Sequence, residues 1–305
     1  MMLTDWQSQT VTEYNSAIES AENIDQLEEV AMELCLSNQL WLQASCWPGV
    51  KRRHQEFGQA DDRMMIVDAL NWMRADFSMN FDVEETAQGF MRRLREFSRN
   101  LKARWVVVAG DSKGESYRKN LRAEYKSSRS ERPSEIGEVV AKVKMLCEHS
   151  QVPYIEQEYW EADDIAATMS TRCIARGHKS IICTNDTDYM QLVNKGCVLY
   201  FKGKFTNIEI VEKTLGIKPN QVVDYLILKG KDDVTSVEGF GPKTATELLQ
   251  KHGDIFGVYD HRHQLTDHKR QALEDFAKNL WSVRECHRLN RNLKIEFNWT
   301  ASNCL

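Results

Sequence analysis

Four short runs of apolar residues alternate with longer segments that have apolar residues at helical spacing. The runs cover residues 64–67, 105–108, 152–155 and 180–183. Continuous apolar runs of this length are typical of strands that are covered on both faces, as in a parallel sheet. Strands that alternate with helices predict an α/β core of three layers, with a mostly parallel sheet in the middle.

Further elements follow from the same pattern. Apolar runs at 198–201 and 208–211 flank a Lys-Gly-Lys turn and predict a hairpin-like pair of strands at the far side of the sheet. Residues 293–297 predict one more short strand. The helix predicted over 161–176 stops at Gly177, a natural left-handed end.

Helical segments lie on both sides of this core. Leu27, Ala31 and Leu34 share one face of a helix in a self-contained N-terminal segment. The chain therefore divides into a helical N-terminal extension (1–62), an α/β core (63–218) that includes a basic arch (113–150), and a helical C-terminal region (219–305).

The composition, with 42% hydrophobic and 28% charged residues in a chain of 305, is that of a soluble globular protein. No apolar run approaches the roughly 18 residues of a membrane helix, and the first residues lack the pattern of a secretory signal. The eight cysteines are scattered without a Cys-x-x-Cys pair, which indicates free thiols in a reducing compartment. We expect a cytoplasmic protein without a membrane partner, acting as a monomer.

Carboxylates follow the apolar runs. Glu161, Asp163 and Asp164 stand together at a helix start, where acidic residues are also common without any ligand because they complement the helix dipole. Four more carboxylates come directly after predicted strands: Asp68, Asp111, Asp186 and Asp188. Because the carboxyl ends of neighbouring parallel strands meet at one edge, we expect all seven to lie close together.

Such a concentration of carboxylates repels itself unless cations are present. With oxygen ligands only, and no histidine or cysteine among them, Mg²⁺ or Mn²⁺ fits better than zinc. Two such ions roughly 4 Å apart clamp the attacking and leaving oxygens of a phosphodiester. The cluster therefore predicts phosphoryl-transfer chemistry.

Two features point to nucleic acid, although the net charge of −5 argues weakly against it. Between 117 and 132, Tyr117 and Tyr125 stand among six cations: Arg118, Lys119, Arg122, Lys126, Arg129 and Arg132. This composition suits a phosphate backbone, but an exposed charged helix explains it about equally well. The Gly-Phe-Gly-Pro-Lys-Thr-Ala run at 239–245, between two helices, predicts a hairpin that holds phosphate.

The order of these motifs resembles the structure-specific 5′-nucleases: the flap endonucleases, the phage 5′-exonucleases and the 5′-nuclease domain of bacterial DNA polymerase I. The resemblance covers about residues 64–297. It rests on Val67 to Asn71, Gly110 to Gly114 with Tyr117-Arg118, Glu124 to Arg129, Glu161 to Asp164, Thr184 to Asp188, and Gly239 to Ala245. It implies a PIN-like core with a helical arch and a C-terminal helix-hairpin-helix.

The resemblance also implies residue roles. Asp68, Asp111, Glu161, Asp163 and Asp164 would surround the tighter of two ions, and Asp186, Asp188 and Asp232 would help to hold the other. Lys126 and Arg129 would contact the scissile phosphate, Tyr125 would stack on a base, and Arg118 would hold a neighbouring phosphate. Gly239, Phe240, Gly241, Lys243 and Thr244 would bind DNA at a hairpin that also takes K⁺.

The implied function is two-metal hydrolysis of DNA at 5′ flaps, nicks or ends in replication or repair, and the resemblance is compatible with RNA primers and a DNA polymerase partner. One departure matters. The family has a Gly-Asp-x-x-Asp-Asn pattern before the hairpin, whereas this chain keeps Asp232 but has Lys229 for the earlier aspartate and Asp233 for the asparagine. Two alternatives therefore stay open: a non-catalytic or single-metal DNA-binding relative with an impaired second metal site, and a metal-dependent ribonuclease of related architecture.

Overall fold

The computed structural model describes residues 4–37, 39–56, 62–80, 82–129, 133–301 and 303. Its sheet has the strand order β3-β2-β1-β4-β5-β6, and each neighbouring pair is parallel except β5 and β6. The strands are β1 (Arg63–Asp68), β2 (Trp105–Ala109), β3 (Tyr154–Ile155), β4 (Lys179–Cys183), β5 (Cys197–Phe201) and β6 (Lys204–Thr206). The predicted mostly parallel sheet is confirmed.

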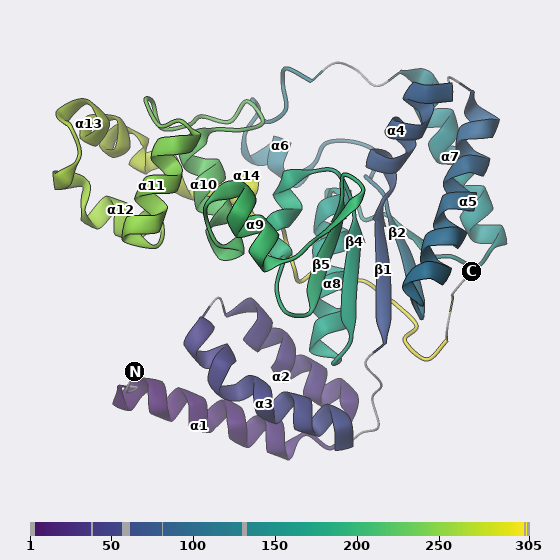
Figure 1. Ribbon diagram of the computed structural model, residues 1–305, viewed down its shortest axis with the longest axis horizontal. Coiled ribbons are helices and arrows are strands. Elements are labelled where there is room, and N and C mark those ends of the chain that lie inside the picture. Colours follow the sequence, from purple (N-terminus) through teal and green to yellow (C-terminus); the bar gives the residue numbers. More distant parts are fainter. Residues whose placement is uncertain are drawn as a thin grey trace.

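Helices cover both faces of this sheet, as Figure 1 shows. One face packs against α4 (Ala69–Asn80), α5 (Val83–Leu101) and α7 (Ser134–His149), and the other against α8 (Ala162–Ala175). Alternation along β1 divides its side chains: Met65 and Val67 join the core under α5, while Met64 and Ile66 join the core under α8. The three layers predicted from the apolar runs are therefore present.

The N-terminal extension is a bundle of α1 (Asp5–Ser20), α2 (Ile24–Leu36) and α3 (Leu40–Glu56) with an apolar core of its own. Asn23 caps α2 by accepting from the backbone N–H groups of Asp25 and Gln26. The bundle contacts the core through α2, which packs against α8 (Figure 1). Buried Glu28 of α2 pairs there with Arg172 of α8 and with Arg176, the C-cap of that helix.

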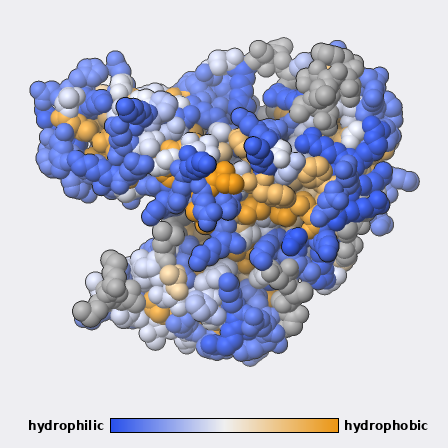
Figure 2. Space-filling model, in the orientation of Figure 1, coloured by the Kyte–Doolittle hydropathy of each residue, from blue (hydrophilic) through white to orange (hydrophobic). Residues whose placement is uncertain are grey.

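The C-terminal region extends to one side of the sheet (Figure 1). It follows α9 (Ile208–Leu215) and contains α10 (Val222–Lys229), α11 (Pro242–His252), α12 (Ile255–Asp260), α13 (Asp267–Phe276) and α14 (Leu280–His287). Short 3-10 turns lie at Thr187–Leu192, Pro219–Gln221, Arg262–Gln264 and Ala277–Asn279. Figure 2 shows a hollow between this region and the N-terminal helices. In the described part of the chain, no helix combines the length and apolar character that crossing a membrane requires.

Two predicted strands are wrong. Residues 208–211 open the helix α9, because Asn207 accepts from the N–H of Ile210 and caps it, and the partner of β5 is instead β6. Residues 293–297 form no strand, although Leu293 and Ile295 are buried against the core.

Candidate active site

The carboxyl ends of β1 and β2 and the turn after β4 bring the predicted carboxylates to one edge of the sheet. Asp68 ends β1, and its Oδ2 accepts from the hydroxyl of Thr184, just past β4, at 2.9 Å. Asp111 follows β2, and its Oδ1 accepts from the N–H of Ala162, the first residue of α8, at 3.0 Å. Burial and the negative charge of Asp111 raise the pKa of Asp68 to about 6.

The start of α8 completes a possible metal centre. Glu161, Asp163 and Asp164 have carboxylate oxygens within 4.8 Å of one another. Burial and the charge of Glu161 raise the pKa of Asp163 well above its ordinary value. A divalent cation relieves this repulsion, and oxygen-only ligands suit hard ions.

Asp164 has a different environment from its neighbours. It is fully buried, and its two oxygens accept from Nη1 and Nη2 of Arg118 at 2.6 and 2.7 Å. Its Oδ1 also accepts from the N–H of Asn290 at 2.7 Å. Both oxygens are thus used by the protein itself, which is the geometry of a support for the site.

Arg118 was predicted to hold a phosphate, and in the structure its donors are engaged by carboxylates and backbone carbonyl groups instead. The side chain is 2% exposed. Besides Asp164 it donates to Glu161 at 2.9 Å and to the carbonyl oxygens of Cys286 and Arg288 at 2.9 and 3.0 Å. A buried guanidinium with this many acceptors has no donor directed at solvent, so its role is to fix the start of α8 against the C-terminal region.

The arch residues lie beside the same carboxylates. Lys126 Nζ donates to Glu161 Oε1 at 2.9 Å, and Arg129 Nη2 donates to Asp232 Oδ1 at 2.7 Å. Tyr125 is 4% exposed and donates its hydroxyl to Glu161, so the predicted stacking of its ring on a base does not fit this arrangement. The short helix α6 (Tyr117–Leu121) begins the arch, and Arg132 lies outside the described residues.

Lys231 is a site residue that the sequence reasoning missed. Its Nζ donates to Asp186 Oδ1 at 2.9 Å and to Asp188 Oδ1 at 2.6 Å. Although burial lowers its pKa, the two carboxylates raise it further, so the ammonium stays charged. Lys229, which the sequence singled out, lies instead over the ring of Tyr225 at 5.5 Å. The available signal was a second lysine directly before Asp232.

Comparison with known protein families identifies the family to which this chain belongs. The family model for the 5′-3′ exonuclease N-terminal resolvase-like domain matches residues 63–223, and that for the 5′-3′ exonuclease C-terminal SAM fold matches residues 217–304. The chain belongs to the 5′-3′ exonuclease family. The predicted 5′-nuclease resemblance is confirmed, and with it a metal-dependent nuclease.

Individual relatives agree with this exonuclease assignment. The chain is 29% identical over 240 residues to flap endonuclease Xni of Salmonella typhimurium. The matched region covers 77% of this chain and 95% of the relative. The structure of T5 5′-exonuclease with bound divalent metal ions (zinc) has a TM-score of 0.66 at 18% identity and covers 75% of this chain and 90% of that one. The catalytic core of Rad2 in complex with a DNA substrate has a TM-score of 0.51 at 19% identity, covering 80% and 84%. Both structures share the fold.

The hairpin of this exonuclease lies where the sequence predicts it. Gly239 has φ of +75°, a conformation that favours glycine, and Gly241 is the N-cap of α11. Lys243 is exposed in the first turn, whereas Phe240 is buried and anchors the hairpin in the core. Lys269 Nζ lies 3.4 Å from the hydroxyl of Thr244 and adds a cation that the sequence reasoning missed. Two lysines therefore lie at the start of α11, where the backbone N–H groups of a helix N-terminus could hold an anion.

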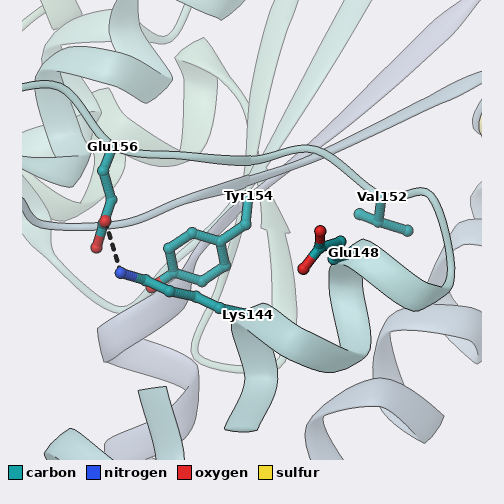
Figure 3. Close-up of a pocket in the computed structure, with 5 residues that line it drawn as sticks. All are labelled: Lys144, Glu148, Val152, Tyr154 and Glu156. Carbon is teal, nitrogen blue, oxygen red and sulfur yellow. Dashed lines mark hydrogen bonds and ion pairs between the residues drawn. The ribbon is translucent and has the colours of Figure 1, made fainter. Parts of the chain in front are cut away.

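A shallow cavity of about 370 Å³ lies away from the carboxylates, beside the edge strand β3 (Figure 3). Lys144 donates to Glu156 across it at 2.6 Å, so the one lysine among its lining residues already has a carboxylate partner. The neighbouring Tyr154 ring explains Gly110, because a Cβ at that position would come within 2.4 Å of the ring. The cavity is thus a by-product of how the strand before Asp111 is packed.

The raised pKa of Asp68 predicts how stability depends on pH without metal. The folded protein holds this proton up to about pH 6, whereas the unfolded chain releases it near 3.8. Between these values the folded state binds more protons, so the free energy of unfolding should fall as pH rises. We expect this fall in urea unfolding without metal, and its reversal by Mg²⁺, which binds the deprotonated carboxylate. An Asp68→Asn variant that shows the same fall would contradict the assignment to Asp68.

Proposed function

We propose that this exonuclease-family protein hydrolyses DNA phosphodiesters near 5′ ends, at flaps and nicks, with Mg²⁺ or Mn²⁺. The observation that carries the proposal is the oxygen-only carboxylate cluster at one sheet edge, with Lys126 and Arg129 beside it. The T5 D15 flap endonuclease, which shares the fold, forms a complex with DNA and metal ions, and the Salmonella relative is itself a flap endonuclease. Both proteins support the same substrate class for this chain.

The first ion would be held by four carboxylates: Asp68, Asp111, Glu161 and Asp163. Oxygen-only donors fit a hard divalent ion. Burial and the charges of neighbouring carboxylates raise the pKa of Asp68 and Asp163, and a bound cation would relieve this repulsion. When bound, such an ion lowers the pKa of a coordinated water and neutralises developing charge. Asp164 contributes indirectly, through the Arg118 contact that fixes the start of α8.

The chain's own cations would neutralise the scissile phosphate. Lys126 and Arg129 are now paired with Glu161 and Asp232. A phosphate oxygen and a metal ion offer each partner a replacement, so substrate binding exchanges these ion pairs without leaving a buried charge alone. At a distance from the cluster, the N–H groups and Lys243 of the hairpin would hold the duplex backbone.

Whether a second ion takes part depends on Lys231. In a two-ion mechanism, Asp186, Asp188 and Asp232 would hold the second ion, and the ammonium of Lys231 would have to leave Asp186 and Asp188. The contacts of 2.6 and 2.9 Å favour a second candidate, a single-ion nuclease in which Lys231 supplies that positive charge permanently. Either way, Asp186 and Asp188 are not left as uncompensated carboxylates.

The test of the nuclease proposal is Mg²⁺-dependent release of a labelled 5′ flap by the native protein. Nicked DNA, gapped DNA and the same three substrates made of RNA are tested in parallel. Cleavage of the DNA substrates supports the proposal, and preference for RNA supports the ribonuclease alternative. Binding without cleavage in both Mg²⁺ and Mn²⁺ favours the non-catalytic relative.

Lys231→Ala separates the two mechanisms. If a second ion has to displace the ammonium, the variant should reach full activity at a Mg²⁺ concentration about tenfold lower than the native protein, because its competitor is gone. If Lys231 itself supplies the charge, activity should fall on the order of a hundredfold and require more Mg²⁺. The measurement is the flap-cleavage rate against Mg²⁺ concentration, with Lys229→Ala as the matched control.

A further inference from the structure

A second cavity, of about 400 Å³, lies where the N-terminal extension, α6 and the segment after α14 meet. Its wall includes Leu36, Tyr117, Trp160, Arg288, Arg291 and Asn292. Arg118 separates it from the carboxylate cluster, since this residue both lines the cavity and bonds Glu161 and Asp164. Lys126, Arg129 and the hairpin are not among its lining residues, so the cavity lies outside the carboxylate cluster and shares Arg118 with it.

The cavity has a surplus of positive charge. Arg291 is half-buried and donates to the carbonyl oxygen of Gln191 at 2.9 Å, and within the described ranges it has no carboxylate partner. Burial lowers its pKa, as expected for a guanidinium without a counter-charge. Among the residues that the structure describes, the one carboxylate that pairs with Arg288 is Glu285, at 3.8 Å, and it also lines the cavity. Arg288 and Arg291 thus face one carboxylate, and the excess guanidinium donors match an anion that has several oxygen acceptors.

One wall of the cavity is aromatic. The rings of Tyr117 and Trp160 are stacked, with centroids 5.1 Å apart and an angle of 26° between planes. The backbone N–H of Tyr117 donates to the carbonyl oxygen of Tyr159 at 2.7 Å, which joins the two chain segments that carry these rings. Both rings are only half-buried, so part of this stack stays accessible to a planar ligand. The exposed amide of Asn292 supplies a donor and an acceptor nearby.

We propose that this cavity binds a nucleotide, with its phosphate on Arg288 and Arg291 and its base against the Tyr117–Trp160 pair. Guanidinium groups beside an accessible aromatic stack match the two chemical parts of such a ligand. The nucleotide is either a free mononucleotide or one unit of a single strand, because both present the same phosphate and base. This site goes beyond the proposed nuclease chemistry and does not depend on it.

The experiment uses the full chain in EDTA, so that cleavage cannot occur. Binding of dTMP, with inorganic phosphate as competitor, is measured by calorimetry, and binding of a labelled hexathymidylate by fluorescence anisotropy. Arg288→Ala should weaken binding about tenfold, the loss of one charge-assisted phosphate contact. The backbone carbonyl of Arg288, which Arg118 uses, stays in place. Arg270→Ala, which changes a partly exposed arginine on α13, is the matched control and should bind as the native protein does.

The two probes distinguish a free mononucleotide from a nucleotide within a single strand. Weaker dTMP binding in Arg288→Ala identifies a free nucleotide, and weaker binding of the hexathymidylate alone identifies a nucleotide within a strand. Either result supports the site if Arg270→Ala is unaffected. Equal affinities of the native protein and Arg288→Ala for both probes, or equal losses in both variants, would overturn it. Flap cleavage in Mg²⁺ is a separate measurement, so failure here leaves the nuclease proposal intact.

Discussion

Asp163→Ala is expected to abolish metal-dependent cleavage while leaving the protein folded. Removing one of the carboxylates that hold the first ion should slow flap release on the order of a thousandfold. Stability should stay the same or rise, because desolvation of the partly buried Asp163 and the charge of Glu161 raise the pKa of Asp163 and disfavour its charged form. The rate is measured at saturating Mg²⁺, and the fold is checked by urea unfolding.

The control for this variant is Asp275→Ala, which removes an exposed carboxylate whose partner is Gln271 on the same helix. It should cleave at the native rate. The role of Asp163 as a metal ligand would have to be abandoned if Asp163→Ala retained more than about a tenth of native activity. Flap binding in the absence of metal should survive in both variants, because the hairpin is untouched.

The fold was predictable where local pattern and tertiary environment agree. The runs at β1, β2 and β4 are apolar on both faces, and their alternation with helices leaves few arrangements besides a parallel sheet. Ile208, Ile210 and Val211 suggested a strand, but the side chain of Asn207 caps a helix there. One capping hydrogen bond thus outweighed the β-propensity of three side chains.

The site was predictable as a location, but not in its internal pairing. Parallel topology alone places Asp68 and Asp111 at one edge. Whether a given carboxylate faces a metal or a cation depends on residues distant in sequence. Arg118 lies 46 positions from Asp164, and Lys231 lies 43 from Asp188. No spacing rule connects such pairs, which is why the pairing of Arg118 with Asp164 was not predicted and Lys231 was missed.

Asp164→Ala should act on stability, in contrast to Asp163→Ala. It removes the carboxylate that holds Arg118 with two hydrogen bonds, both partners being at most 2% exposed. Leaving a buried guanidinium with part of its counter-charge missing should lower the free energy of unfolding by about 3–5 kcal/mol. The N–H of Asn290 also loses its acceptor, which loosens the segment after α14. Equilibrium urea unfolding at pH 7 gives the value.

A paired substitution separates charge from packing. In Asp164→Ala with Arg118→Met, no unpaired charge remains, so part of the lost stability should return even though more contacts are removed. If Asp164 mattered only through packing, adding Arg118→Met would instead lower the free energy of unfolding further. A loss below about 1 kcal/mol in Asp164→Ala alone, together with absent metal-dependent cleavage, would instead make this carboxylate a metal ligand like Asp163. The two neighbours at the start of α8 are thus told apart by stability, because activity depends on both.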